Sequence, residues 1–295
     1  MSNARNENLG YLYGFVGVAA FALTLPATRI AVRALDPVFI GLGRALGSAA
    51  LAALYLALTR ARRPTREEAG RLAIVAAGVV VGFPILTAWA MRHVDASHGG
   101  VVLGILPLAT VMAGFVLNGE RPSGRFWFFA VLGSALVVGY SLLRAGGGIE
   151  WADLALLGAV ASAAVGYAQG ARLAQAMGGM AVISWTLVIA APFILLPVLL
   201  TAPASLGQPA SAWLAFAYVM VVSQFLGFVP WYRGLALGGL AKVSQVQLLQ
   251  PFLTILASVF IVGEPADATT WIVALLVVAV VAMGKSSRVA NALSR

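Results

Sequence analysis

One long uncharged stretch constrains this chain most, because no Asp, Glu, Lys or Arg occurs between Arg172 and Arg233. It is longer than two membrane-crossing helices of about 20 residues each. Over the whole chain 61% of residues are hydrophobic and 10% are charged, whereas soluble domains carry roughly 25% charged residues. The chain therefore cannot cover a water-facing surface, and we expect an all-α integral membrane protein.

Ten apolar segments are long enough to cross a bilayer. We expect helices rather than a barrel, because backbone groups in lipid must be hydrogen-bonded within the segment and no short alternating strands are visible. A turn rich in Pro, Gly and Ser, 201–209, separates the seventh segment from the eighth. The expected spans are 9–32, 37–59, 72–91, 97–118, 125–143, 153–176, 180–200, 212–232, 242–262 and 267–284.

The Lys and Arg residues predict the orientation of these spans. With the amino terminus inside, the arginines of segment 60–71 and the basic carboxyl-terminal residues face the cytoplasm. The predicted outer side then receives only Arg29, Arg33, Arg92 and Arg144, in agreement with the positive-inside rule. We expect both termini in the cytoplasm of a bacterial-type inner membrane.

The two halves of the sequence resemble each other at a constant offset of 144 positions, the difference between Pro251 and Pro107. This offset predicts a first unit at 9–144 and a second unit at 153–285, each with five spans. At that offset Pro107, Thr110, Gly119, Glu120 and Trp127 coincide with Pro251, Thr254, Gly263, Glu264 and Trp271.

An odd number of spans in each unit has a topological consequence. The second unit must enter the bilayer from the side opposite to the first, so that the two five-helix repeats are inverted. Inverted repeats are typical of secondary transporters, in which one half rocks against the other around a site near the midplane. We therefore expect a carrier that works by alternating access.

Three motifs resemble those of the drug/metabolite transporter superfamily. They are Pro107 with Gly119-Glu120, Pro251 with Gly263-Glu264, and Asp36-Pro37 followed by Arg44. The chain resembles the ten-span branch with two EamA-type repeats, and within it the YddG-type aromatic amino acid exporters. The resemblance implies an inner-membrane exporter with a central cavity walled by spans 1, 3, 4, 6, 8 and 9.

The ninth span carries a polar face that indicates a substrate site. Ser244, Gln247, Pro251, Thr254 and Ser258 recur at helical spacing, and Gln245 and Gln250 flank them. Unpaired amides are costly in lipid, so these side chains either bond neighbouring helices or line a cavity. We favour the cavity, where amides and hydroxyls bind the polar end of an amino acid.

Arg44 and two prolines are further candidates. Arg44 lies inside the second span, where it either links helices, the interpretation we favour, or recognises a substrate carboxylate. Pro107 and Pro251 each free a backbone carbonyl. They are hinge candidates, with a static kink as the alternative.

Aromatic residues are candidates for the apolar wall of the site. Trp89, Tyr167 and Trp185 lie within expected spans. Trp231 and Tyr232 are also candidates, but they lie close to the end of a span, where interfacial anchoring is the competing explanation.

Two histidines, His93 and His98, flank the expected turn between spans 3 and 4. Their neutral-range titration suits proton coupling, but we expect both to be solvated. His98 is retained as a site candidate. Glu120 and Glu264 follow apolar runs, and we expect them to cap turns or pair with loop arginines.

These features together predict an exporter of amino acids, including aromatic ones and other small zwitterionic metabolites. There are two alternatives. A multidrug or cationic-compound carrier is disfavoured because the expected spans of this chain contain no carboxylate, and a membrane-embedded enzyme is disfavoured because the sequence offers no set of catalytic residues. The chain has no cysteine, and we expect no metal, no cofactor and no nucleic-acid partner. The expected partners are the substrate and membrane lipid, and we expect the protein to be a monomer.

Overall fold

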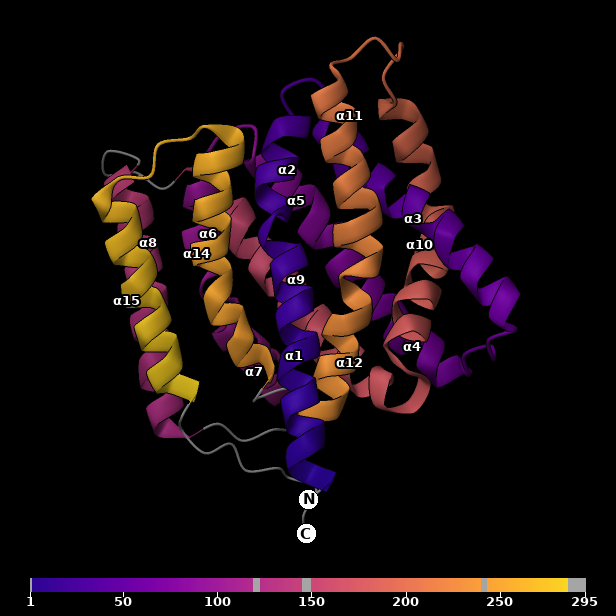
Figure 1. Ribbon diagram of the computed structural model, residues 1–295, viewed down its shortest axis with the longest axis horizontal. Coiled ribbons are helices and arrows are strands. Elements are labelled where there is room, and N and C mark those ends of the chain that lie inside the picture. The colour runs from indigo at the N-terminus through magenta and orange to yellow at the C-terminus, as the bar shows by residue number, and fades with distance from the viewer. Residues whose placement is uncertain (1, 119–122, 145–149, 240–242, 286–295) are drawn as a thin grey trace.

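The computed structural model describes residues 2–118, 123–144, 150–239 and 243–285. In these ranges all regular secondary structure is helical, and the helices run side by side as one bundle (Figure 1). The expectation of an all-helical, multi-span membrane protein is confirmed. Glu120 lies outside the described ranges.

Apolar helices occur at the ten expected positions. Six are long and apolar enough by themselves, a bent pair forms a seventh, and three shorter apolar helices complete the set within the described ranges. The long spans of the first unit are α1 (Ser2–Ala22) with α2 (Thr24–Ala31), α3 (Pro37–Thr59), and α4 (Arg66–Val75) with η1 (Ala76–Gly82) and α5 (Phe83–Ala90). Those of the second unit are α9 (Trp151–Met177), α10 (Gly179–Thr201), and α11 (Ala210–Ala217) with η2 (Tyr218–Leu226) and α12 (Phe228–Gly238).

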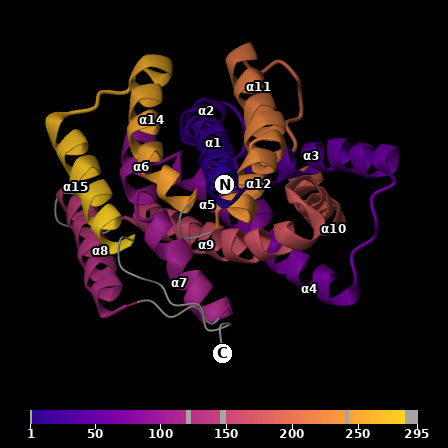
Figure 2. The ribbon, with the colours of Figure 1, turned by 60° about the horizontal axis from the view of Figure 1, so that its bottom comes forward.

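The remaining helices lie at the positions expected for the fourth, fifth, ninth and tenth spans. The bent pair is α6 (Ala96–Leu103) and α7 (Leu106–Asn118), whose axes differ by 41°. The others are α8 (Gly124–Arg144), α15 (Ala268–Lys285), and a ninth span made of η3 (Ser244–Leu249), α14 (Gln250–Ala257) and η4 (Ser258–Val262). Figure 2 shows α8 and α15 paired at one edge of the bundle and α3, α4 and α10 at the other.

Local sequence determines where α3 begins and ends. The Asp36 carboxylate accepts hydrogen bonds from the Val38 and Phe39 amides, and Pro37 occupies the first turn, where its missing N–H is not needed. Arg60 ends the helix in the left-handed conformation, with φ 49°. This start places Arg44 two turns inside the span.

The helical irregularities of the two units coincide at the same offset of 144 positions. The π-helical segment η1 corresponds to η2, and the break between α6 and α7 corresponds to the change from η3 to α14. A wide π turn leaves carbonyls to be satisfied from elsewhere. Gln224 Nε2 donates to the Val79 carbonyl at 3.1 Å, and Ser48 Oγ donates to the Met220 carbonyl at 2.5 Å. Each of these bonds joins one unit to the other.

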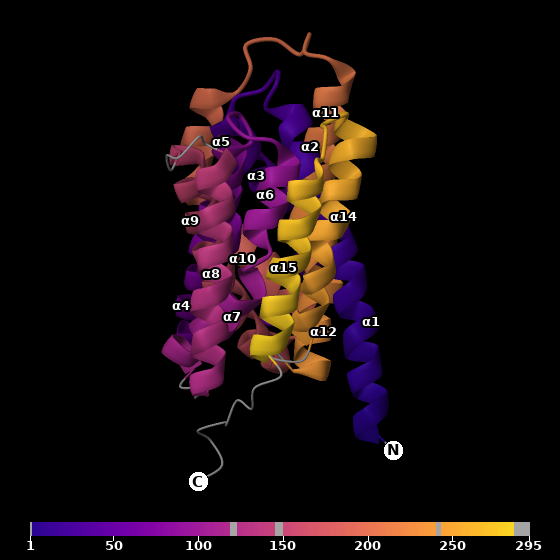
Figure 3. The same cartoon turned by 90° about the vertical axis from the view of Figure 1, so that its left-hand side faces the viewer.

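Glycines allow α1 and α12 to pack with their backbones in contact. A Cβ atom at Gly10 would lie 2.8 Å from the Gly238 backbone, and one at Gly234 would lie 2.8 Å from the Gly14 nitrogen. Such small-residue crossings are a common way to join helices in lipid. In Figure 3 α1 and α12 run beside one another near the amino terminus.

Arg29 marks one end of the bundle and the amino terminus marks the opposite end. Arg29, near the end of the first span, and Asp153, near the start of the sixth, both bond to segment 95–98. The end of the first span and the start of the sixth therefore lie at one end, here called the Arg29 end, at the top of Figure 1. The amino terminus lies at the other, amino-terminal end.

Gly234→Val is expected to lower the thermal unfolding temperature of the purified protein, because the added methyl groups force α1 away from α12. Overpacking of this kind costs about 1–3 kcal/mol. The matched control is Gly139→Ala on α8, where an added Cβ meets nothing within 4 Å. Equal unfolding temperatures for Gly234→Val and Gly139→Ala in a detergent melt would contradict the close crossing.

Candidate substrate site

A central cavity lies among helices of both units. Its side chains leave about 10 Å³ open to a water-sized molecule, so the cavity is nearly closed in this arrangement. The wall is contributed by α1, α2, α3, α5, α6, α9, η2, α12 and α14. Its lining residues are Phe21, Thr24, Leu25, Arg44, Phe83, Leu103, Tyr167, Ser223, Phe228 and Gln250.

Arg44 is the charged residue of this wall, and its side chain is 2% exposed. No hydrogen bond or ion pair of its guanidinium occurs within the described ranges, and its buried Nε atom has no acceptor there. Within the described ranges nothing bonds the guanidinium to a neighbouring helix, so the structure lends no support to Arg44 as a link between helices. An unpaired buried cation is costly and attracts an anion.

Polar side chains surround the cavity beside Arg44. Thr24 Oγ1 and Ser223 Oγ form a 2.8 Å hydrogen bond between the first and eighth spans. Gln250, 8% exposed, and Tyr167, 4% exposed, complete the polar part of the wall. In the described residues, no Asp or Glu lines the cavity.

The first span breaks beside the cavity for a reason visible in its sequence. Pro26 has no N–H to donate to the Ala22 carbonyl, the acceptor four residues earlier. Thr254 Oγ1 donates to that carbonyl instead, at 2.9 Å. Thr254 was expected to line the cavity, but its hydroxyl is used to satisfy the broken helix.

The apolar part of the wall continues into an aromatic cluster. The Phe21 and Phe228 rings lie 4.9 Å apart, and Tyr167 packs edge-on against Trp231 at 5.4 Å. Trp231 and Tyr232 are 0% exposed, so they are not interfacial anchors. The position of α12 between α1 and α9 buries them, which a distance along the sequence does not reveal.

Two expected aromatic wall residues lie elsewhere. Trp89 is 38% exposed and packs against His93, with ring centroids 4.6 Å apart. Trp185 donates from Nε1 to the Arg62 carbonyl at 3.1 Å, in the loop between α3 and α4. Neither residue lines the central cavity, contrary to expectation.

The polar residues of the ninth span divide between cavity and interior. Gln250 lines the cavity, whereas Ser244 is 0% exposed and absent from its wall. Gln247 is 1% exposed, and neither atom of its amide has a partner in the described ranges. The side chain of Gln245 lies outside what the structure describes. Pro107 and Pro251 occupy the second positions of α7 and α14, directly after the breaks.

His98 is buried rather than solvated. It is 6% exposed, and its Nε2 atom lies 2.6 Å from Oδ1 of Asp153. Solvation was expected because His98 lies close to the turn between the third and fourth spans. The partner lies on the sixth span, and nothing in the local sequence pointed to it.

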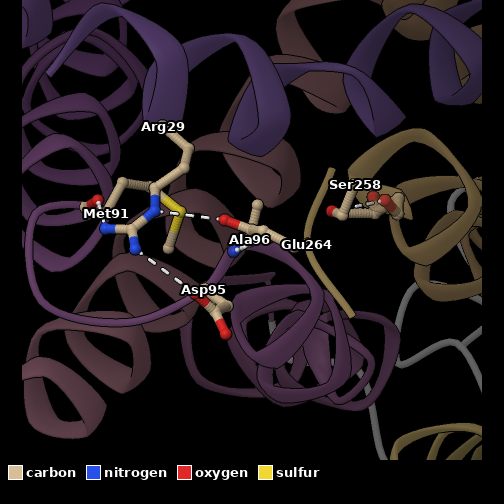
Figure 4. Close-up of polar contacts among 7 residues, drawn as sticks. Arg29, Met91, Asp95, Ala96, Ser258 and Glu264 are labelled. Carbon is tan, nitrogen blue, oxygen red and sulfur yellow. Dashed lines mark hydrogen bonds and ion pairs between the residues drawn. The ribbon is translucent and has the colours of Figure 1, made fainter. Parts of the chain in front are cut away.

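A cluster of charges at the Arg29 end joins α2 to two loops, the one before α6 and the one before α15 (Figure 4). Arg29 Nε donates to Glu264 Oε1 at 3.1 Å, Nη2 to Asp95 Oδ1 at 3.2 Å and Nη1 to the Met91 carbonyl at 2.6 Å. Glu264 Oε2 accepts from the Ala96 amide at 2.8 Å. These contacts are here called the Arg29 cluster. The bonds of Glu264 to Arg29 and Ala96 join the second unit to the first, and the arginine that pairs with Glu264 lies on α2 rather than in a loop.

Burial, followed by the nearby negative charge of Asp95, raises the pKa of Glu264 above its ordinary value. The Ala96 amide and Arg29 oppose this increase without cancelling it. Ionised Glu264 is therefore held in place by specific donors in a site that otherwise disfavours charge.

A wider groove opens at the amino-terminal end between α3, α10 and α12. It has a volume of about 510 Å³ and includes Tyr55, Gly179 and Arg233. None of the expected site residues lines it. The Arg233 guanidinium stacks on the Tyr13 ring, 4.7 Å from its centroid, and so already has an interaction. The central cavity is the better candidate for a substrate site.

Comparisons with known proteins find similarity to transporters along most of the chain. The EamA-like transporter family matches residues 8–142 and again residues 150–283. The uncharacterized transporter YdeK of Bacillus subtilis (strain 168) is 43% identical over 258 residues, which cover 86% of this chain and 89% of that one.

More distant similarities extend over comparable lengths. The probable terminal-alkyne amino-acid exporter of Streptantibioticus cattleyicolor is 24% identical over 255 residues, covering 84% of this chain and 83% of that one. A solved crystal structure with 21% identity superposes with a TM-score of 0.66 over 93% of this chain and 97% of the other. That similarity shows a shared fold.

Arg29→Gln is expected to destabilise the protein, because it leaves buried Glu264 without its cation. Hydrogen bonds to charged groups contribute about 1.5–3 kcal/mol each, and the half-exposed Asp95 contact adds little. The exposed Arg33→Gln is the control. In a double-mutant cycle Arg29→Gln with Glu264→Gln should lose less than the sum of the single changes. Additive losses in thermal unfolding would contradict the pairing.

The stability of the protein should decline as pH rises through the raised pKa of Glu264, because the folded chain favours the protonated carboxyl more than the unfolded chain does. The relevant window lies above the ordinary value of 4.5. Glu264→Gln should flatten this decline, whereas Glu67→Gln, at a side chain 78% exposed, should not. Unfolding temperatures across pH for the three proteins test this, and parallel curves would refute it.

Proposed function

Because the chain belongs to the EamA-like transporter family, we propose that it exports small metabolites bearing a carboxylate, amino acids first, by alternating access. The substrates include aromatic and other small zwitterionic amino acids. The printed name of the distant Streptantibioticus relative, an amino-acid exporter, supports this substrate class.

The observation that carries the proposal is the buried guanidinium of Arg44, which has no bonded partner among the described residues, in a cavity shared by both units. A carrier for zwitterions must compensate a carboxylate in a low-dielectric site. Arg binds carboxylates through two parallel hydrogen bonds, which also fixes the orientation of the bound group. The cavity therefore provides the partner that a carboxylate needs, and the carboxylate provides the anion that Arg44 lacks.

The remaining wall matches the other parts of an amino acid. Tyr167, Ser223 and Gln250 present oxygen atoms that accept hydrogen bonds from an ammonium group. Phe21 and Phe228 offer an apolar surface for the side chain. Such a mixture of aromatic walls and few polar groups is usual in small-molecule sites.

Alternating access requires that the two units be inverted and that each end of the cavity close in turn. The odd number of spans in each unit supports inversion, as does the proximity of Arg29 and Asp153 at one end of the bundle. We place both termini in the cytoplasm of a bacterial-type inner membrane, with the Arg29 end outside. In this arrangement the Arg29 cluster is the outer closure.

A carrier for cationic drugs is less compatible with this cavity. Such a substrate calls for a carboxylate, whereas the described wall carries the cation Arg44 and aromatic rings. A membrane-embedded enzyme is a weaker alternative still, because the described residues of this wall include no nucleophile paired with a base.

Arg44→Gln should weaken substrate binding, because it removes the cation that pairs with the carboxylate, and should raise thermal stability, because it removes a buried charge with no partner among the described residues. Losing a charge-assisted pair of bonds is expected to weaken amino-acid binding by at least about tenfold, since 1.4 kcal/mol corresponds to a factor of ten. The measurements are counterflow of labelled amino acids in proteoliposomes and detergent melts with and without substrate. The control is Arg172→Gln, at an exposed position.

The two readouts separate the explanations for Arg44. If Arg44 were purely structural, its replacement would lower the thermal stability of the protein and would reduce transport only through misfolding. Wild-type counterflow in Arg44→Gln with normal membrane insertion would remove the residue from the site. Transport of organic cations but no amino acid by the unaltered protein would overturn the proposed function.

A further inference from the structure

His98 and Asp153 form a buried titratable pair at the Arg29 end, outside the central cavity. Nε2 of His98 lies 2.6 Å from Oδ1 of Asp153, and their side chains are 8% and 4% exposed. His98 belongs to α6 in the first unit and Asp153 to α9 in the second unit. The contact therefore holds the two units together.

Other groups keep this pair in place. The His98 ring stacks on Tyr140 of α8 with centroids 5.1 Å apart. The second carboxylate oxygen of Asp153 accepts from the Glu150 amide at 3.3 Å, at the start of α9. The pair is a bonded unit in which an imidazole faces one carboxylate.

The first turn of α6 connects this pair with the Arg29 cluster. Asp95 accepts a hydrogen bond from Arg29, and the Ala96 amide donates to Glu264. His98, which contacts Asp153, follows in the same turn of α6. Both contacts must separate if the first unit moves away from the second at this end. They are two parts of one closure.

The charged and titratable groups around the pair can be named from each neighbouring element. α6 and its preceding loop contribute Asp95, α9 contributes Asp153 with Glu150 before it, and α8 contributes Tyr140. The loop before α15 contributes Asp267, which bonds Thr270, the partner of Tyr140. Arg29 and Glu264 lie on the other side of segment 95–98.

We propose that the His98–Asp153 pair is a proton-binding site whose occupancy sets how firmly the Arg29 end is closed. A proton on His98 makes the contact an imidazolium–carboxylate ion pair, which is stronger than a neutral hydrogen bond in a buried setting. Loss of the proton leaves a weaker bond between the units. Histidine exchanges its proton near neutral pH, with a usual midpoint of about 6.5.

Thermodynamic linkage gives the direction of the effect. If the proton strengthens the closed arrangement, closure must in turn strengthen proton binding. Acid at the outer face therefore favours the closed Arg29 end, and a neutral or alkaline exterior favours its opening. The inference rests on the proposed function for the assignment of this end to the outer face.

The absence of cysteine from the sequence permits a direct accessibility assay. Leu103→Cys places a thiol in the cavity wall, where the native side chain is 5% exposed. Intact cells carrying this variant are treated with a membrane-impermeant thiol reagent at external pH values between about 5.5 and 8, spanning the histidine range. Labelling from outside reports opening of the Arg29 end.

Three further substitutions, each combined with Leu103→Cys, test the role of the pair. His98→Gln and Asp153→Asn remove the proton site, and His93→Gln is the matched histidine control. Division by the His98→Gln rate at each pH cancels the intrinsic pH dependence of the thiol. All comparisons are repeated with Glu264→Gln, because protonation of Glu264 acts in the same direction.

The labelling rate divided by that of the His98→Gln variant should fall at least about threefold as the exterior is acidified. This fall is expected in the protein with both His98 and Asp153 and in the His93→Gln variant. Asp153→Asn should remove the fall. The same relative profile in Asp153→Asn as in the unaltered pair, or no pH dependence beyond that of His98→Gln, would overturn the proposal.

A second measurement does not depend on how well the variants of the pair fold. In the His93→Gln protein His98 is the single remaining histidine, so its side-chain nitrogen signals report its protonation by magnetic resonance. The signals should change with pH between about 5.5 and 8. An imidazole that never changes state in this range would also overturn the proposal. Neither measurement uses the substrate, so Arg44→Gln binding data test the proposed function separately.

Discussion

Backbone hydrogen bonding in lipid is the constraint on which this structure depends. A helix that breaks within the bilayer leaves carbonyls that water cannot reach, and each unsatisfied group costs several kcal/mol. Around the central cavity these carbonyls accept from side chains of the opposite unit. Thr254 donates to Ala22, Gln224 to Val79 and Ser48 to Met220.

These cross-unit bonds explain how spans are interrupted around one cavity without loss of the fold. The interruptions occur where Pro26, Pro107 and Pro251 remove a donor, or where a π turn widens the helix. Each unit completes the hydrogen bonding of the other, so the cavity is a property of the pair. The close backbone contact between α1 and α12 brings the units near enough for these bonds.

Charge is distributed differently at the centre and at the Arg29 end. At that end Arg29 and His98 each have carboxylate partners across the boundary between units. At the centre the Arg44 guanidinium has none within the described ranges. Paired charges stabilise a contact between the units, whereas a buried cation without a bonded partner stabilises an anion that enters the central cavity. This contrast separates the closing contacts from the proposed substrate site.

Hydropathy and proline positions in the sequence by themselves determined the class of protein, the positions of its spans and the existence of two related units, because these depend on local properties of each segment. Arg44, Tyr167 and Gln250 were also identifiable, as polar or aromatic groups that lipid does not tolerate or that suit a cavity. Only the tertiary structure decided that Arg44 has no bonded partner among the described residues, that His98 faces Asp153, and that Trp89 and Trp185 do not line the cavity. Each of these facts is a relation between helices distant in sequence, and the direction of a side chain toward a particular neighbour is fixed by packing rather than by the period of its own helix.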